Sequence, residues 1–121
     1  MPYRILVVDD NELNLELVSK ILELDGYEVA AADSGELALQ KVGEFKPDLA
    51  LLDVMMPDMN GFELCRRLRQ LPVSINMPII MLTAASGEED RMMAKKAGAN
   101  DLLGKPFNLD TLSEHIKVLL K

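Results

Sequence analysis

The sequence predicts an α/β fold in which helices cover both faces of a parallel sheet. Three short apolar runs, at Ile5–Val8, Leu49–Leu52 and Ile79–Leu82, have the length and the uniform hydrophobicity of strands buried on both faces. Segments with helical spacing of apolar residues lie between them, so strands and helices alternate along the chain. Strict alternation with right-handed crossovers is typical of a doubly wound sheet.

Two weaker strand candidates complete this sheet. Tyr27–Ala32 carries the charged residue Glu28, and Asp101–Leu103 is very short, so both suit the edges of a sheet. The flavodoxin-like (βα)5 order 2-1-3-4-5 then fits, because it places the first, third and fourth strands along the chain in the centre. The sequence contains no linker, repeat or low-complexity tract, so we expect residues 1–121 to form a single domain.

Helical patterns fill the gaps between the strands. The apolar positions that share one helix face are Leu13, Leu17, Ile21 and Leu24 in the first helix, Leu64, Cys65, Leu68 and Leu71 in the third, and Leu109, Leu112, Ile116 and Leu119 in the fifth. Asp33 and Glu36 fit a capping box before the second helix, Leu37–Phe45. The fourth, Glu88–Ala97, is a poorer pattern that is rich in charge and methionine.

Three further residues predict where the helices begin and end. Asn108 is the expected N-cap of the fifth helix, because its side-chain oxygen can accept a hydrogen bond from a free backbone N–H. Gly26 and Gly98 stand where the first and fourth helices should stop.

Composition narrows the classes of function. The net charge of −7 over 121 residues argues against direct nucleic-acid binding, which needs a basic face. No apolar run approaches the roughly 18 residues of a membrane span, and Met1–Arg4 leads straight into a strand-like run, so we expect neither a membrane segment nor a signal peptide. The single cysteine, Cys65, excludes an internal disulfide and is expected to be a buried small hydrophobe. Together these features favour a cytoplasmic protein.

Polar residues collect where the predicted strands end. Asp9 and Asp10 follow the first strand, Asp53 the third, Thr83 the fourth, and Lys105 the last. Ligands of doubly wound sheets bind beyond the carboxyl ends of the strands, at the point where the strand order reverses. We therefore expect three carboxylates, a hydroxyl and an ammonium to meet at one edge of the sheet.

This set of side chains suits phosphoryl transfer. Crowded carboxylates repel one another unless a hard cation neutralises them, and Mg²⁺ prefers carboxylates, water and phosphate oxygens. One carboxylate could then attack phosphorus, Lys105 could balance the incoming charge, and Thr83 could donate a hydrogen bond to a phosphoryl oxygen.

The motifs around these residues resemble those of the receiver domains of two-component response regulators, over essentially the whole chain. Val7–Asn11 is similar to the family's acidic metal motif, Asp53–Gly61 to its phosphoacceptor loop, Leu82–Ala84 to its signalling threonine segment, and Lys105–Phe107 to its lysine motif. Each motif alone is weak. Four in order, each at the end of a predicted strand, are highly specific.

The resemblance implies a role for each residue. Asp53 would take a phosphoryl group from the phosphohistidine of a histidine kinase or a phosphotransfer protein. Asp10, Asp53 and the backbone carbonyl of Met55 would hold Mg²⁺, with Mn²⁺ as an alternative ion, and Asp9 would act directly or through water. Lys105 would be placed by a cis peptide bond to Pro106.

The resemblance also implies how the signal leaves the site. The domain would be a switch and not an enzyme, apart from self-catalysed phosphoryl transfer and dephosphorylation. Thr83, Ala84 and the loop after them would reshape the surface of helix 88–97, strand 101–103 and the last helix. That surface would bind a downstream protein or output domain, or a second copy of the chain.

Three positions differ from the family's usual residues or are expected to affect the lifetime of the phosphorylated state. The family commonly has Tyr or Phe where Leu102 stands, so we expect Leu102 to stay packed and signalling to rely on Thr83 and the following loop. Met55 and Ala85 flank the path of the attacking water in the family, and neither side chain can orient a water, so we expect slow self-dephosphorylation.

Alternative interpretations remain open at this point. Asp9, Asp10 or Asn11 could cap a helix, and Thr83 could be a structural turn hydroxyl. Met92 and Met93 are expected in the core or an interface, and His115 is expected to be exposed without a function. Rival functions are a phosphatase with an acid nucleophile, a flavin site, and a degenerate receiver that binds partners constitutively.

Overall fold

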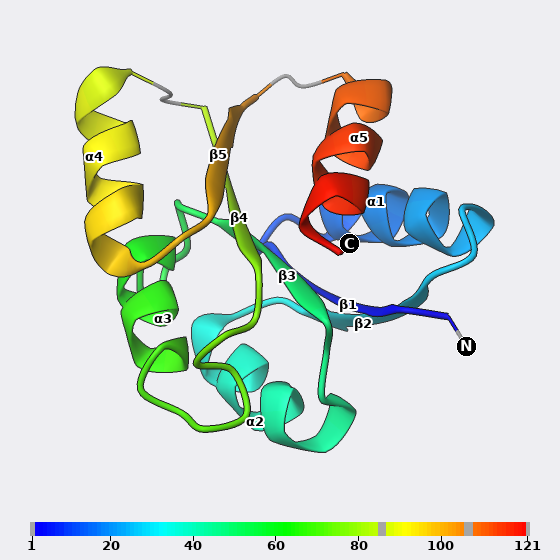
Figure 1. The fold of residues 1–121 in the computed structure, drawn as a ribbon, viewed down its shortest axis with the longest axis horizontal. Helices are drawn as coiled ribbons and strands as arrows, with labels where there is room; N and C mark the ends of the chain where they lie inside the picture. Colours follow the sequence, from blue (N-terminus) through cyan, green and yellow to red (C-terminus); the bar gives the residue numbers. More distant parts are fainter. Residues whose placement is uncertain (1, 85–86, 106–107, 121) are drawn as a thin grey trace.

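The computed structural model describes residues 2–84, 87–105 and 108–120 (Figure 1). The strands are β1 (Arg4–Val8), β2 (Glu28–Ala32), β3 (Leu49–Asp53), β4 (Ile79–Thr83) and β5 (Asp101–Gly104). The helices are α1 (Glu12–Leu24), α2 (Gly35–Phe45), α3 (Gly61–Leu68), α4 (Glu88–Ala97) and α5 (Leu109–Leu119). Strands and helices alternate strictly along the chain, as the sequence predicts.

The strands form one parallel sheet in the order β2-β1-β3-β4-β5. This confirms the predicted flavodoxin-like order, with the two weaker strands at the edges. All residues of β3 and β4 are buried, whereas β2 begins with exposed Glu28. The central strands can be uniformly apolar because helices cover both of their faces.

The two faces of the sheet carry separate cores, because successive strand residues point to opposite sides. On one face, Ile5, Val7 and their neighbours pack against Val18 and Leu22 of α1 and against α5. On the other face, Leu6 and Val8 belong to a cluster that includes residues of α2, α3 and α4. In Figure 1 the pair α1 and α5 lies to the right of the sheet, away from α3 and α4.

The predicted α1 stripe is not the face that packs on the sheet. Leu13, Leu17 and Leu24 are 78%, 58% and 87% exposed, while Val18 and Leu22 are buried. The helix has apolar residues on two faces. The face with Val18 and Leu22 packs against the apolar side chains of the sheet.

Two predicted helix starts have different outcomes. The capping box at Asp33 is wrong, because α2 is capped one residue later by Ser34, whose hydroxyl accepts the Leu37 N–H at 3.2 Å. Asn108 caps α5 as predicted, accepting the Asp110 N–H at 2.7 Å. Gly98 ends α4 with a φ of 98°, the left-handed conformation that glycine adopts without strain.

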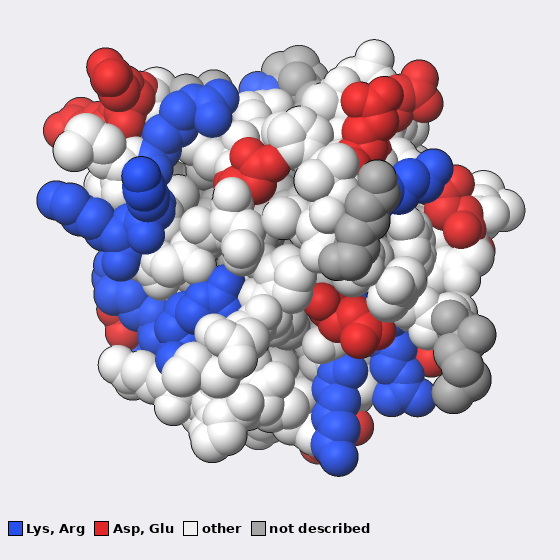
Figure 2. Space-filling view, in the orientation of Figure 1, with Lys and Arg blue, Asp and Glu red and all other residues white. Residues whose placement is uncertain are grey.

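α4 carries its charge in two blocks. Glu88, Glu89 and Asp90 open the helix, and Lys95 and Lys96 close it, which matches the helix dipole. Figure 2 shows red side chains at the upper end of this helix and blue ones further down. Met92 and Met93 are 56% and 44% exposed, so they do not lie in the core, and the predicted alternative of an interface position stays a prediction. No helix in the described ranges is long and apolar enough to cross a membrane.

Candidate functional site

Four strand ends meet at one edge of the sheet, as predicted. The register pairs Val8 with Leu52, Asp53 with Leu82, and Thr83 with Gly104. The residues that follow β1 and β5 therefore lie beside the last residues of β3 and β4. The Lys105 N–H donates to the Thr83 carbonyl at 2.7 Å, which holds the end of β5 against β4.

Three carboxylates converge at this edge. Asp9, Asp10 and Asp53 each offer an oxygen, and these oxygens lie within 4.8 Å of one another. Asp9 and Asp53 are 5% and 6% exposed, whereas Asp10 faces solvent. The cluster is thus open on the Asp10 side and closed beneath.

The chain bends after Val8 so that both neighbouring aspartates can reach the site. The Asp9 N–H still donates to the Ala32 carbonyl of β2 at 3.1 Å, and the Asp9 carboxylate accepts the Asn11 N–H at 2.9 Å. Asn11 caps α1 by accepting the Asn14 N–H. The capping role therefore falls to Asn11, and the alternative that Asp10 caps this helix is not needed.

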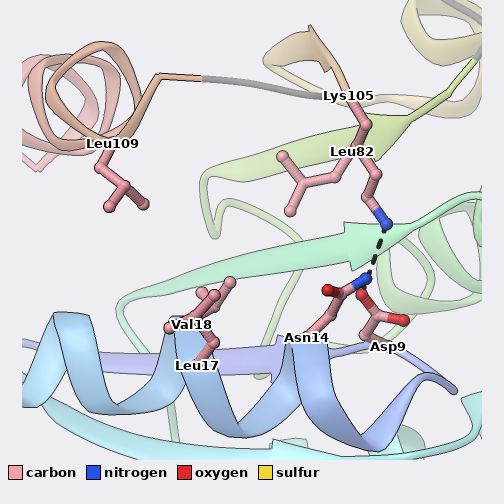
Figure 3. A pocket seen from close by; sticks show the side chains of 7 residues that line it. All are labelled: Asp9, Asn14, Leu17, Val18, Leu82, Lys105 and Leu109. Carbon is pink, nitrogen blue, oxygen red and sulfur yellow. Dashed lines mark hydrogen bonds and ion pairs between the residues drawn. The ribbon is translucent and has the colours of Figure 1, made fainter.

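Lys105 bridges two of the carboxylates. Its Nζ lies 3.1 Å from Asp53 Oδ1 and 3.4 Å from Asp9 Oδ2. Figure 3 shows the lysine reaching down to Asp9 from the end of β5. The Lys105 side chain is 23% exposed and paired with both aspartates, so its ammonium is held within the site.

Opposing effects act on the Asp53 carboxyl. Burial raises its pKa above the ordinary value, and the charge of Asp9 adds to this, while Lys105 and the Met55 N–H act in the opposite direction. The balance is a raised pKa. The ionised form of Asp53 is thus less stable at this buried position than it would be in water. A cation bound beside it would stabilise that ionised form.

The loop after β3 is built tightly against the strand end. A Cβ on Gly61 would lie 2.4 Å from the Asp53 carbonyl oxygen, so only glycine fits there. The Gly61 N–H donates to the Val54 carbonyl at 2.8 Å, and the Val54 N–H donates to Leu82. The Met55 side chain is 71% exposed, so its backbone is what it can offer to the site.

The structure describes the positions of some of the predicted signalling residues. Thr83 and Leu102 are 2% and 3% exposed, and Ala84 is exposed. Ala85 and the Lys105–Pro106 peptide, with Phe107, fall on residues 85–86 and 106–107, outside the described residues.

The donor set fits a small divalent cation. Carboxylate oxygens are the ligands that Mg²⁺ prefers, and the two charges of a divalent ion would offset the excess of three carboxylates over one ammonium. Asp10 and Asp53 could hold such an ion with the Met55 carbonyl. Asp9 is already engaged by Lys105 and the Asn11 N–H, which suits a role through water.

Sequence reasoning missed a pocket beside the site. It has a volume of about 550 Å³ and is lined by Asp9, Asn14, Leu17, Val18, Leu82, Lys105 and Leu109 (Figure 3). Its polar end is formed by Asp9, Asn14 and Lys105, and its apolar end lies between α1 and α5. The sequence feature that could have indicated this pocket is the second set of leucines on α1. A helix with two apolar faces packs one of them on the sheet and leaves the other exposed.

Comparisons with known proteins agree with this geometry. The family model of the response regulator receiver domain matches residues 5–117. The alkaline phosphatase synthesis transcriptional regulatory protein PhoP of Bacillus subtilis is 42% identical over the whole chain, and the response regulator PleD of Caulobacter vibrioides is 40% identical. The chain spans 50% of the first and 27% of the second.

Solved structures show the same fold. Chemotaxis protein CheY4 of Vibrio cholerae superposes with a TM-score of 0.95 at 36% identity, covering 99% of this chain and 100% of that one. A CheY-like receiver domain protein of Methanospirillum hungatei has a TM-score of 0.92 at 37% identity, covering 99% and 94%. Strand order, site geometry and family match agree, and the chain belongs to the response regulator receiver domains of two-component systems.

Proposed function

We propose that Asp53 accepts a phosphoryl group from the phosphohistidine of a histidine kinase or a phosphotransfer protein, and that this switches a binding surface of the domain. The observation that carries the proposal is the setting of the Asp53 carboxylate. It is buried at a strand end, paired with Lys105 at 3.1 Å, and clustered with Asp9 and Asp10.

In the proposed transfer, a carboxylate oxygen of Asp53 forms the new bond to phosphorus. The P–N bond of the phosphohistidine breaks, and its electron pair returns to the imidazole nitrogen. Such a reaction requires mainly positioning and charge neutralisation. Lys105 would balance the transferred charge, and Thr83 would donate to a phosphoryl oxygen. A bound Mg²⁺ or Mn²⁺ would supply the remaining neutralisation.

The pocket in Figure 3 supports access of a donor side chain. It is lined by Asp9 and Lys105 at its polar end and by Leu17 and Leu109 at its apolar end, so an imidazole could approach Lys105 and Asp9 along an apolar wall. The rival phosphatase reading expects a second acid at the position of Met55, where the chain has an exposed thioether. The flavin reading expects a phosphate-binding loop after β1, where the chain has carboxylates.

Phosphorylation by a small donor tests the proposal. The whole chain, incubated with acetyl phosphate and Mg²⁺, should gain one phosphoryl group by intact-mass spectrometry. Asp53→Ala should gain none, and chelation of Mg²⁺ should prevent the reaction in the parent. Asp33→Ala, which removes an exposed carboxylate that is not part of the cluster, is the matched control. Equal labelling of Asp53→Ala and the parent would refute Asp53 as the acceptor.

The proposed output surface is formed by α4, β5 and α5. The phosphoryl group adds a charge near −2, which should draw Thr83 and the next loop inward. Figure 2 shows basic side chains on α4, whose last turn contains Lys95 and Lys96. Asp101 of β5 pairs with His115 of α5. We propose that this surface binds a downstream protein, an output domain, or a second phosphorylated copy.

Leu102 makes the route of the signal distinctive. It is 3% exposed and belongs to the same core cluster as Ala94 and Ala97 of α4. A hollow of about 280 Å³ beside it is lined in part by Ala94, Lys95 and Ala99. We propose that Leu102 stays packed and that the loop after Thr83 carries the signal. Crystal structures with and without a phosphate mimic would decide this, and a large reorientation of Leu102 would contradict it.

We further propose that the phosphorylated state is long-lived. Met55 cannot orient an attacking water, and Ala85 is equally inert in chemistry. Met55→Asn should therefore lose its phosphoryl group faster than the parent, measured by the decay of the phosphorylated mass after the donor is removed. An unchanged decay would count against this role of Met55.

A further inference from the structure

We propose that Asp58 is a positioning residue for the metal centre, acting by fixing the loop after β3 to the start of α2. This inference rests on the proposed function, because it concerns the Mg²⁺ that Asp53 and the Met55 carbonyl would hold. Asp58 itself does not belong to the cluster. Among the described residues, the carboxylates close enough to share an ion are Asp9, Asp10 and Asp53.

The Asp58 carboxylate is bound to the N-terminus of α2. One oxygen accepts the Gly35 N–H at 3.2 Å, and the other accepts the Glu36 N–H at 3.1 Å. The first N–H groups of a helix have no partner within the helix, and the helix dipole favours an anion there. Burial alone would raise the pKa of Asp58, but the backbone N–H groups of Gly35 and Glu36, together with those of Asp58 and Met59, outweigh burial and lower the pKa. The side chain is therefore held at the start of α2 as an anion.

The next residue makes a second contact with the same helix turn. A Cβ on Gly35 would lie 2.5 Å from Cγ of Met59, so the methionine lies directly against the glycine backbone. Met59 is also packed against the core cluster that includes Ala38 and Phe62. The tip of the loop is therefore fixed both by hydrogen bonds and by packing.

The base of the loop is fixed independently. Gly61 lies against the Asp53 carbonyl and donates to Val54. Only Met55, Met56 and Pro57 separate the fixed base at Val54 from the fixed tip at Asp58. Within this short bridge, the backbone N–H of Met55 lowers the pKa of the Asp53 carboxyl, opposing the effect of burial. Release of the tip would free the bridge that carries both the Met55 N–H and the Met55 carbonyl.

Mg²⁺ affinity of the whole chain, measured by calorimetry, tests this role. In Asp58→Ala the dissociation constant should rise on the order of tenfold, the scale seen when a group that holds a metal ligand in place is removed. Asp58→Asn keeps an oxygen that can accept from α2, so its dissociation constant should lie between those of the parent and Asp58→Ala. Asp33→Ala removes the same charge near the same helix end without touching the loop, and should bind like the parent.

A second readout does not depend on the metal. Hydrogen exchange of the amides in residues 54–60, without Mg²⁺, should be faster in Asp58→Ala and unchanged in Asp33→Ala. Gly35→Ala should also speed this exchange, because the new Cβ displaces Met59 while Asp58 remains. If urea titrations show that Asp58→Ala does not fold, Asp58→Asn carries the test of Asp58, and Gly35→Ala reports the contribution of the Met59 contact.

The outcomes separate this inference from the proposed function. If the parent binds no Mg²⁺, the proposed function fails. If the parent binds Mg²⁺ and Asp58→Ala binds equally well, only the role of Asp58 is overturned. Equal losses in Asp58→Ala and Asp33→Ala would also overturn it, because they would indicate a general effect of charge. Equal losses in Asp58→Asn and Asp58→Ala would overturn the role of the hydrogen bonds to α2, because the amide oxygen of asparagine can still accept them.

Discussion

At the scale of single residues, Asp53 illustrates how a reactive group can be costly to the fold that holds it. Asp53 is 6% exposed and lies near Asp9, while among the described residues Lys105 and one backbone N–H favour its charged form. Burial and the nearby charge of Asp9 disfavour the ionised carboxylate, and for the same reason an added cation would stabilise it. A surface aspartate would lack this property, because water would already solvate it.

Removal of this charge should stabilise the metal-free protein. Burial raises the pKa of Asp53, so the folded state holds the proton to higher pH than the unfolded state, and ionisation favours unfolding as the pH rises above the ordinary value of 3.8. In a chelator at neutral pH, Asp53→Asn should be more stable than the parent by on the order of 1 kcal/mol in urea titrations. The difference should vanish in acid, where both states are protonated. A variant less stable than the parent at neutral pH would contradict this reading.

Cys65 shows the opposite case, a potentially reactive group that the fold silences. It is fully buried, its thiol donates to the Ala97 carbonyl at 3.3 Å, and burial raises its pKa to about 11 despite nearby Arg69 and Arg66. An aromatic disulfide reagent should react with it only in denaturant.

The same thiol should also affect stability in alkali. The unfolded thiol ionises near pH 9.0 and the folded one near 11, so between these values ionisation favours the unfolded state. Stability should fall with rising pH by up to about 1.4 kcal/mol per pH unit from this group alone. Cys65→Ala should show a shallower decline, and parallel curves would refute the assignment.

At the scale of elements, the sequence predicted the positions of the chemistry better than the packing of the helices. The carboxyl ends of parallel strands meet at one edge whatever the helices do, so Asp9, Asp53 and Lys105 could be brought together from strand order alone. The choice between two apolar faces of α1 depends on the shape of the sheet beneath it. The choice between Asp33 and Ser34 as the cap of α2 depends on the angle at which the chain enters the helix. Local sequence encodes neither the packing face of α1 nor this entry angle.

Two substitutions in α1 measure this difference between its faces. Leu22 is 1% exposed and Leu13 is 78% exposed. Leu22→Ala should lose about 2–5 kcal/mol of unfolding free energy, because it removes buried methyl groups and leaves a cavity. Leu13→Ala should change stability by no more than about 0.5 kcal/mol, the usual range for an exposed site. Urea titrations of both variants under the same conditions provide the comparison, and equal losses would mean that the stripe at Leu13 packs after all.

At the scale of the whole molecule, the site exists only in the folded chain. Asp10 and Asp53 are 43 residues apart in the sequence, and they come together because β1 and β3 are neighbours in the sheet. Unfolding separates the carboxylates, so the unfolded chain has no cation site formed by them. A cation that binds the folded state alone must therefore stabilise the fold.

Mg²⁺ should accordingly raise the unfolding free energy of the parent in a predictable way. Once the ion is in excess over its dissociation constant, each tenfold increase in its concentration should add about 1.4 kcal/mol. Urea titrations at several Mg²⁺ concentrations, with NaCl added to hold ionic strength constant, measure this slope and separate binding from charge screening. Asp10→Asn and Asp53→Asn should flatten the slope, because each loses a ligand, whereas Asp33→Asn should keep it. If Mg²⁺ and NaCl of the same ionic strength changed the unfolding free energy of the parent equally, the parent would lack a specific Mg²⁺ site, because charge screening does not require clustered carboxylates. The repulsion among the three carboxylates would then destabilise the folded state without a bound cation to offset it.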